Sequence, residues 1–554
     1  MSAVPQSTWT SVTSTDVGYR LAVAHPADGG FDDVLQGLVE DRVASRIAAQ
    51  DPTPWGSAAE DEAGKRLAWV GLSTASRDLV DDIATLEVEL RAANLIRVVL
   101  CGMGGSSLAP EVICGADDVE LVVLDSSDPD FVRSAIAERL EETVVVVSSK
   151  SGGTVETDSQ KRAFEHAFTE AGIDPARRIV VVTDPGSPLE ESAREAGYRV
   201  FLADPEVGGR YSALTAFGLV PSGLAGANVQ RLLDEAEAIR PHLEADSTDN
   251  PGLRLGALLG AANRAGADKL VLADAGSDHA GLGDWAEQLI AESTGKDGKG
   301  VLPVVVDRLD APNLSPSTAD EVLATYGPGQ VLGDEVTPAS GWAVRVDATL
   351  GAQMLLWEYA TAVAGRVIGI NPFDQPDVES AKAAAREMLD GGGTTPTPAF
   401  TEGPVTVFAS EGWLPAGTDT VEAAVRALLD QLDQDTGYVS VQAYLDRHRD
   451  AALASVRDGL ARRTGRPTTF GWGPRFLHST GQYHKGGPAT GVYLQVTCEA
   501  EQDLEVPGRP FTFGEFLAAQ AVGDGQVLAD KGRPVLRVHL ASPADVSEVR
   551  QVLG

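Results

Sequence analysis

The stretch VVVVSSKSGGTVET, from Val144 to Thr157, decides the fold. It opens with four consecutive valines, and an unbroken apolar run of this length is typical of a strand buried on both faces in a parallel sheet. A loop of serines, glycines and one lysine follows, and we expect a helix to begin near Thr154 with Glu156 in its first turn. Backbone N–H groups and hydroxyls ahead of a helix N-terminus form a binding site for an anion. A polar strand-to-helix turn without a ligand is the alternative.

A second loop of the same kind lies upstream. The strand Ile96–Leu100 runs into GMGGSSLAPE, from Gly102 to Glu111, which again reads as strand, glycine turn and helix. Further strands, among them Ile179–Thr183, alternate with helices, and this alternation predicts an open parallel sheet that binds ligands at the carboxyl ends of its strands. A dinucleotide site is an open alternative, because Asp125 ends the next strand at a position suited to a ribose.

Composition narrows the class of ligand and partner. The chain of 554 residues has 44 basic and 81 acidic residues, a net charge of −37, which argues against nucleic acid and anionic membranes as partners. An anion site must then be locally basic, so a cation inside a glycine loop carries extra weight. Three cysteines without CxxC spacing and eight histidines without a ligand motif indicate neither a disulfide framework nor a metal site. The absence of a secretory signal and of a membrane-spanning apolar run predicts a cytoplasmic protein.

The chain divides into four regions, and its fold class is α/β. Residues 1–90 are predicted to be a helical N-terminal region, with helices over Phe31–Gln50 and Ser76–Ala92. Residues 91–245 and 246–390 form two α/β domains with parallel sheets. Residues 391–554 form an additional α/β region, in which Val405–Ala409, Tyr438–Val441 and Gly491–Thr497 are predicted strands, and Thr420–Leu432 and Tyr444–Arg463 predicted helices.

Two charged residues occupy positions that suit chemistry. Two glycines precede Arg210 in GGRYSALTAFG, from Gly208 to Gly218, and they permit a tight turn that projects the guanidinium. Glu292 lies where a predicted helix runs into the glycine turn STGK, and is a candidate acid or base. A surface arginine at a helix cap and a solvated glutamate at a helix end are the alternatives.

Five stretches together resemble one family. GMGGSSLAPE, SSKSGGTVET, GGRYSALTAFG, ESTGK (Glu292–Lys296) and FDQPDVESAK (Phe373–Lys382) resemble, in this order, the phosphoglucose isomerases. The resemblance implies two SIS (sugar isomerase) domains, each an α/β/α sandwich, and covers roughly residues 96–382. The segment GPRFLHSTGQYHKGGP makes the chain most similar to the isomerase half of transaldolase–glucose-6-phosphate isomerase fusions.

The resemblance implies a role for each matching residue. It places Arg210 as the cation that stabilises an enediolate, Glu292 as the base and Lys382 in ring opening. It implies contacts to the sugar phosphate from a further set: Gly105, Ser106, Ser149, Lys150, Ser151, Thr154, Gln288 and Gln375. The implied reaction interconverts glucose 6-phosphate and fructose 6-phosphate, moves one proton between C1 and C2, and needs no metal or nucleotide cofactor.

The sequence departs from the family pattern at one catalytic position. The family supplies a histidine across a homodimer interface from a Gly-Gln-His motif, and the corresponding stretch here is Gly351-Ala352-Gln353. Either Gln353 substitutes for it or another group serves, with His478 and His484 of the C-terminal region as candidates. A structural role for both histidines is the alternative. The resemblance implies a homodimer.

Three other functions stay open on the sequence. A broader isomerase would also take mannose 6-phosphate. An SIS module that binds sugar phosphates without turnover would lack a working base, and Glu292 and Arg210 argue against it. A nucleotide-dependent dehydrogenase would leave the second glycine loop without a role.

Overall fold

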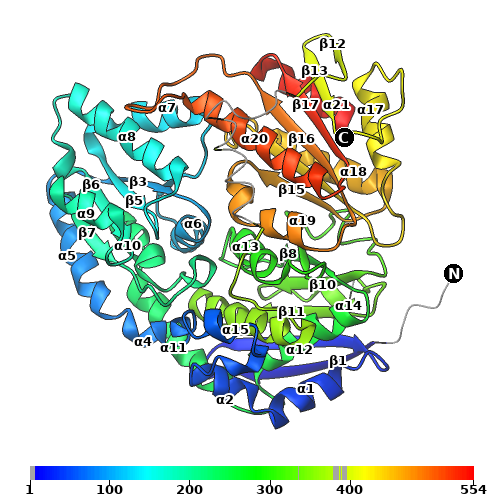
Figure 1. Ribbon diagram of the computed structural model, residues 1–554. Helices are drawn as coiled ribbons and strands as arrows, with labels where there is room; N and C mark the ends of the chain where they lie inside the picture. Colours follow the sequence, from blue (N-terminus) through cyan, green and yellow to red (C-terminus); the bar gives the residue numbers. More distant parts are fainter. Residues whose placement is uncertain (1–6, 335, 378–385, 387–388, 390–395) are drawn as a thin grey trace.

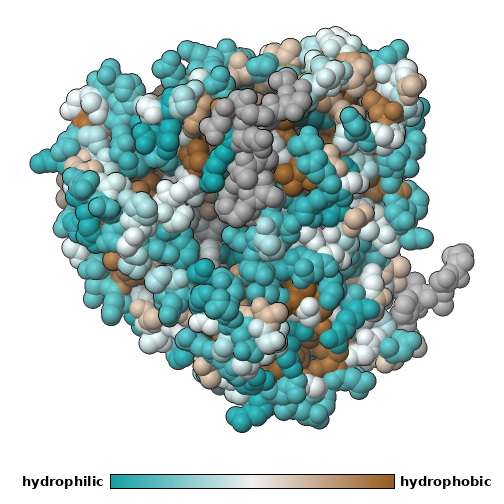
Figure 2. Space-filling view, viewed as in Figure 1, coloured by the Kyte–Doolittle hydropathy of each residue, from teal (hydrophilic) through white to brown (hydrophobic). Residues whose placement is uncertain are grey.

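The computed structural model describes residues 7–334, 336–377, 386, 389 and 396–554. Three mainly parallel sheets, each with its own helices, surround a central region (Figure 1). This confirms the predicted α/β class. Most of the face seen in Figure 2 is hydrophilic, with scattered apolar patches, as expected for a chain with 81 acidic and 44 basic residues.

The first domain is built on a fully parallel sheet of order β4-β3-β5-β6-β7. Its strands are β3 (Arg97–Gly102), β4 (Val122–Leu124), β5 (Thr143–Ser148), β6 (Ile179–Thr183) and β7 (Arg199–Leu202). Its helices are α6 (Leu108–Ala116), α7 (Pro129–Ala137), α8 (Val155–Glu170), α9 (Pro188–Glu195) and α10 (Ala216–Ala225). All six residues of β5 are buried, as the run of valines predicted.

The second domain has a sheet of order β1-β2-β11-β10-β8-β9. Its strands are β1 (Ser7–Ser14), β2 (Tyr19–Pro26), β8 (Lys269–Asp274), β9 (Leu302–Val306), β10 (Glu321–Tyr326) and β11 (Ala343–Asp347). Its helices are α11 (Val229–Leu243), α12 (Pro251–Arg264), α13 (Leu282–Thr294), the short α14 (Val331–Asp334) and α15 (Leu350–Ile368). The apolar α15 packs on α11, α12 and α13, which explains why nearly all of it is buried.

The N-terminal region differs from the prediction. The helices α1 (Phe31–Glu40), α2 (Val43–Ala48) and α5 (Asp78–Ala92) lie within the predicted helical stretches, and short helices α3 (Glu60–Ala63) and α4 (Leu72–Ala75) lie between them. Residues 7–26, however, form the hairpin β1–β2. This hairpin extends the sheet of the second domain, because β2 pairs antiparallel with β11 and seven of its eight residues are buried. The pairing partner lies more than 300 residues away, beyond the reach of local periodicity.

The third domain is a separate α/β unit with the sheet order β12-β13-β17-β16-β14-β15. Its strands are β12 (Phe400–Glu402), β13 (Val405–Ala409), β14 (Tyr438–Tyr444), β15 (Thr468–Trp472), β16 (Gly491–Cys498) and β17 (Val535–Leu540). Its helices are α17 (Val421–Leu429), α18 (Val456–Thr464), α19 (Gly481–Gly486), α20 (Phe513–Asp530) and α21 (Val546–Leu553). The predicted helix over Tyr444–Arg463 was wrong in its first half, because β14 continues to Tyr444 and α18 begins only at Val456. The long helix α20 was not predicted.

Candidate active site

The two glycine loops lie at the same edge of the first sheet. Strands β3 and β5 are parallel neighbours with Gly102 opposite Ser148, so the loops that follow them are adjacent. The first loop approaches the turn before Arg210 so closely that a Cβ atom on Gly105 would lie 1.9 Å from the carbonyl oxygen of Gly209. Glycine is therefore required for the contact between these two segments.

The same loop also contacts the second and third domains. A Cβ atom on Gly104, whose φ is +57°, would lie 2.8 Å from Nε2 of Gln288 and 2.9 Å from the carbonyl oxygen of His478. Ser106, half-buried at the end of the short 3-10 turn Gly104–Ser106, follows directly. The loop thus joins segments from all three domains.

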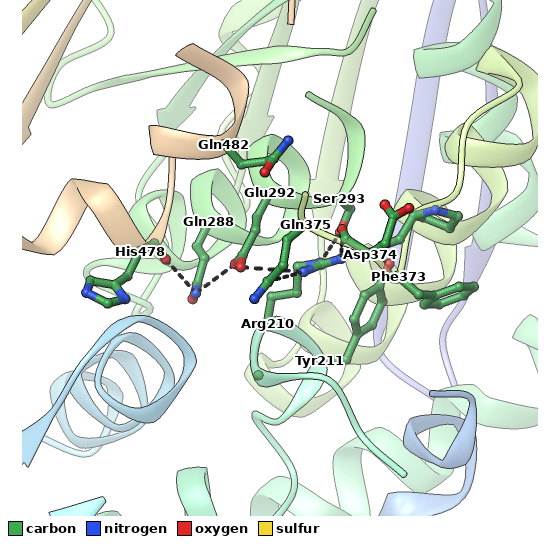
Figure 3. Close-up of polar contacts among 12 residues, drawn as sticks. Arg210, Tyr211, Gln288, Glu292, Ser293, Phe373, Asp374, Gln375, His478 and Gln482 are labelled. Carbon is green, nitrogen blue, oxygen red and sulfur yellow. Dashed lines mark hydrogen bonds and ion pairs between the residues drawn. The ribbon is translucent and has the colours of Figure 1, made fainter. Parts of the chain in front are cut away.

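Arg210 occupies the centre of this meeting point (Figure 3). Its Nε donates to Oγ of Ser293 at 2.8 Å, and Nη1 donates to Oε1 of Gln375 at 2.9 Å. Its Nη2 donates to the carbonyl oxygens of Pro372 and Asp374, at 2.8 and 2.9 Å. Four hydrogen bonds hold the guanidinium rigidly, as a planar five-donor group allows.

Glu292 lies beside that guanidinium. It is in the last turn of α13, its side chain is 8% exposed, and its Oε1 lies 3.5 Å from Nη1 of Arg210. Its Oε2 accepts from Nε2 of Gln288, one turn earlier on the same helix, at 3.1 Å. The same Nε2 also donates to the carbonyl oxygen of His478 at 2.8 Å, so α13 is tied to the third domain. The structure therefore brings Glu292, Arg210, Gln288 and Gln375 together.

The serine-rich loop ends at an uncapped helix. Oγ of Ser149 lies 3.3 Å from Oγ1 of Thr154, and Oγ of Ser151 accepts from the backbone N–H of Gly153 at 3.2 Å. Thr154 is the N-cap of α8 but its side chain accepts no bond from the helix, whereas Asp128 and Ser187 cap α7 and α9. The first N–H groups of α8 are thus left for an anion.

Lys150 is held away from this helix end. Its Nζ lies 2.6 Å from Oδ2 of Asp184, in the loop that follows β6. The carbonyl oxygens of Asp204 and Pro205 lie 3.5 and 3.4 Å from the same nitrogen. The lysine is therefore neutralised within the protein in this arrangement, and an anion would compete with Asp184 for it.

The two candidate histidines have different surroundings. Nε2 of His478 lies 3.0 Å from Oε1 of Glu156, in the first turn of α8, while its carbonyl oxygen receives Gln288. His484 is buried in the third domain, with its ring nitrogens 3.0 Å from the hydroxyl of Tyr438 and 3.3 Å from Oγ of Ser440. Burial lowers the pKa of His484 well below its usual value. The geometry brings His478 to the site and assigns His484 to the core of its domain.

Gln353 is remote from any surface. Its side chain is inaccessible inside α15, where Oε1 accepts from Nε1 of Trp357 at 3.3 Å. A residue buried in this way cannot be presented to another subunit, so of the two alternatives the structure favours a different group.

Two other residues had been singled out. Lys382 lies outside the described residues. Asp125 is 1% exposed and its Oδ2 accepts from Nη1 of Arg475 of the third domain at 2.8 Å, so it is not available to a ribose. The dinucleotide interpretation loses the residue on which it depended.

Two side chains at the site were not predicted. Nζ of Lys296 lies 2.6 Å from both the carbonyl oxygen and Oδ1 of Asp374, and burial, followed by the nearby Arg210, lowers its pKa to about 8. Gln482 of α19 donates to the carbonyl oxygen of Gly295 at 2.9 Å and accepts from the N–H of Asp377 at 2.9 Å. Lys296 closes the motif ESTGK and could have been noted there, whereas nothing local marks Gln482.

Within the described residues, no group of three or more His, Cys, Asp or Glu is arranged to hold a metal ion. No helix in the same part of the chain combines the length and apolar character needed to cross a membrane.

The comparisons with known proteins agree with this site. Residues 71–300 match the family Phosphoglucose isomerase. A protein of Haloarcula marismortui named "Probable glucose-6-phosphate isomerase" is 30% identical over 351 residues, which span 55% of this chain and 80% of the relative. The chloroplastic glucose-6-phosphate isomerase 1 of Arabidopsis thaliana is 27% identical over 445 residues, 65% of this chain and 71% of the relative.

A solved structure supports the fold. A glucose-6-phosphate isomerase from Chlamydia trachomatis superimposes with a TM-score of 0.56 at 20% identity, over 69% of this chain and 89% of that one. A Thermus thermophilus protein of hypothetical function gives a TM-score of 0.57 at 23% identity, over 69% of this chain and all of that one. From the relatives and the matched family segment together, the chain belongs to the glucose-6-phosphate isomerase family.

Proposed function

We propose that the protein interconverts D-glucose 6-phosphate and D-fructose 6-phosphate through an enediolate. The observation that carries the proposal is the buried Glu292–Arg210 pair, 3.5 Å apart, at the meeting point of two glycine loops. Names of relatives with this activity support it.

In this proposal Glu292 is the base. The reaction takes a proton from C2 of the aldose and returns it to C1, so one carboxylate must reach both carbons. The hydrogen bond from Gln288 orients Oε2, which leaves Oε1 beside Arg210. Negative charge develops on the O1 and O2 oxygens of the enediolate, and a guanidinium already fixed by four hydrogen bonds stabilises it without reorganising.

The phosphate would bind at the start of α8. Ser149, Ser151 and Thr154 line the loop there, and the N–H groups of the uncapped helix point toward it. The phosphate is remote from the reacting carbons, so its binding energy serves to orient them. Ring opening is assigned to His478, which is the candidate histidine at the site. Glu156, on the next turn from the phosphate loop, fixes the orientation of its ring. The proposed homodimer and cytoplasmic location rest on the family resemblance and the composition.

A coupled assay tests the activity. Fructose 6-phosphate is supplied, and the glucose 6-phosphate formed is oxidised by a dehydrogenase with production of NADPH. Glu292→Gln should abolish turnover and exchange of the C2 proton with solvent, while 6-phosphogluconate still binds. Wild-type exchange in this variant would overturn the base assignment.

The control is Glu287→Gln on the same helix. Burial raises the pKa of Glu287 to about 8, so its carboxyl is mostly protonated at pH 7 and glutamine resembles it closely. Activity should stay near that of the wild type. A sugar-phosphate-binding protein without turnover would instead bind 6-phosphogluconate and fail the assay in all variants. Mannose 6-phosphate supplied in place of fructose 6-phosphate separates the broader isomerase from the narrow one.

A further inference from the structure

A second cavity, of about 490 Å³, lies between the first and third domains. One wall is the start of α7, at residues 128–130, and the other is made by β13, β16, β17 and α20. Among the described residues that line it, none belongs to the candidate active site. The question it raises is independent of the proposed function.

The cavity arises from the two unlike faces of the third sheet. Leu536, Val538 and Leu540 of β17 point into the main apolar core of the domain. Side chains alternate along a strand, so Arg537 and His539 point to the opposite face, where α20 lies. The helix presents small or aliphatic side chains to that face: Leu517, Ala518, Ala521 and Val522. The space left between helix and sheet is mostly apolar.

One charge in this space has no counter-charge. The Arg537 side chain lines the cavity, is nine-tenths buried, and its guanidinium lies 4.3 Å from the centre of the Phe408 ring. Within the described chain it makes no ion pair and no hydrogen bond. Burial lowers its pKa to about 10, so it is still protonated at neutral pH. A buried charge without a partner is costly, and a bound anion would relieve that cost.

The other charged groups that line the cavity are already satisfied. Arg449 pairs with Asp130 and Asp450, both at 2.8 Å. His539 lies 3.2 Å from Oε1 of Glu499, and Asp128 caps α7. Arg537 is therefore the group in this lining that is left to recognise a ligand.

We propose that the cavity binds a small organic monoanion, a carboxylate with an apolar body. The planar fork of Arg537 matches a carboxylate, and the aliphatic side chains of α20 match the apolar body. The acidic residues at the edge, Glu499, Asp503 and Glu515, disfavour ligands with several negative charges. A volume of about 490 Å³ is in the usual range for small-molecule sites.

Titration calorimetry with four carboxylates tests the proposal. Phenylacetate, 3-phenylpropanoate, 4-phenylbutanoate and octanoate are titrated into the full chain, each beside its neutral primary amide. At least one carboxylate should bind with 1:1 stoichiometry, and at least tenfold more tightly than its amide. Failure of all four to bind saturably would overturn the proposal.

Two variants locate the binding. Arg537→Gln should weaken the carboxylate at least tenfold, while Arg463→Gln, at an exposed arginine of α18, should leave it unchanged. Ala518→Trp fills the cavity from an exposed position of α20 and should also abolish binding. Equal affinity in the wild type and Ala518→Trp would place the binding elsewhere and refute the site. Ala518→Trp decides the matter if Arg537→Gln does not fold.

Discussion

Nη1 of Arg210 lies 3.5 Å from Oε1 of Glu292, and both side chains are more than nine-tenths buried. The two residues come from different domains and are 82 positions apart in the sequence. A buried pair of this kind is costly to desolvate, and it persists here because four further hydrogen bonds satisfy the guanidinium. The relationship places a base and a fixed positive charge at one point.

Arg210→Lys should lower kcat/KM by about 10² to 10³. Lysine keeps the charge but cannot hold Ser293, Gln375 and the carbonyl oxygens of residues 372 and 374 together. Steady-state kinetics with fructose 6-phosphate measures the effect, with Arg463→Lys at the surface as control. A kcat/KM within threefold of the wild type would show that charge alone suffices.

His478→Asn and His484→Asn should have opposite effects. His478 contacts the site through Glu156 and Gln288, so its loss should slow turnover of the cyclic substrate more than that of a sugar phosphate lacking the ring-closing hydroxyls. His484 is enclosed by Tyr438 and Ser440, so its loss should lower the melting temperature. Kinetics and thermal denaturation of both variants check this. Equal losses on cyclic and open-chain substrates in His478→Asn would exclude the histidine from ring opening.

Lys150→Ala should weaken binding of 6-phosphogluconate with little change in kcat. Asp184→Asn should do the reverse and tighten it by roughly threefold to tenfold, because the lysine would no longer be paired at 2.6 Å. Calorimetric titration of the inhibitor into each variant measures both effects. If Asp184→Asn weakens the inhibitor instead, the carboxylate positions Lys150 and does not compete with the ligand.

Glu287→Gln should change how stability depends on pH. The pKa of Glu287 is raised to about 8 in the folded chain, first by burial and then by Asp284, while the unfolded value is near 4.3. The folded state keeps its proton while the unfolded state loses it, so this group's contribution is full below about pH 4 and is lost as pH rises to about 8. The variant should therefore be more stable than the wild type at pH 8, on the order of 2 kcal/mol, and the difference should shrink toward pH 5. Urea denaturation at both pH values measures this, and a difference independent of pH would contradict the raised pKa.

The sequence by itself determined the local parts of this protein. The four valines before Ser148 predicted a buried parallel strand, and the glycine loops and ESTGK predicted where ligands and a base lie. These signals are readable because burial on both faces and close backbone approach each demand particular residue types at neighbouring positions.

Only the tertiary structure decided what meets across the domains. It joined residues 7–26 to β11, separated His478 from His484, and showed that Lys150 is paired with Asp184. It also revealed Arg537 without a partner in a cavity between two domains. Such outcomes depend on contacts between residues far apart in the chain, and neither hydrophobic periodicity nor turn chemistry encodes which distant surfaces will pack together.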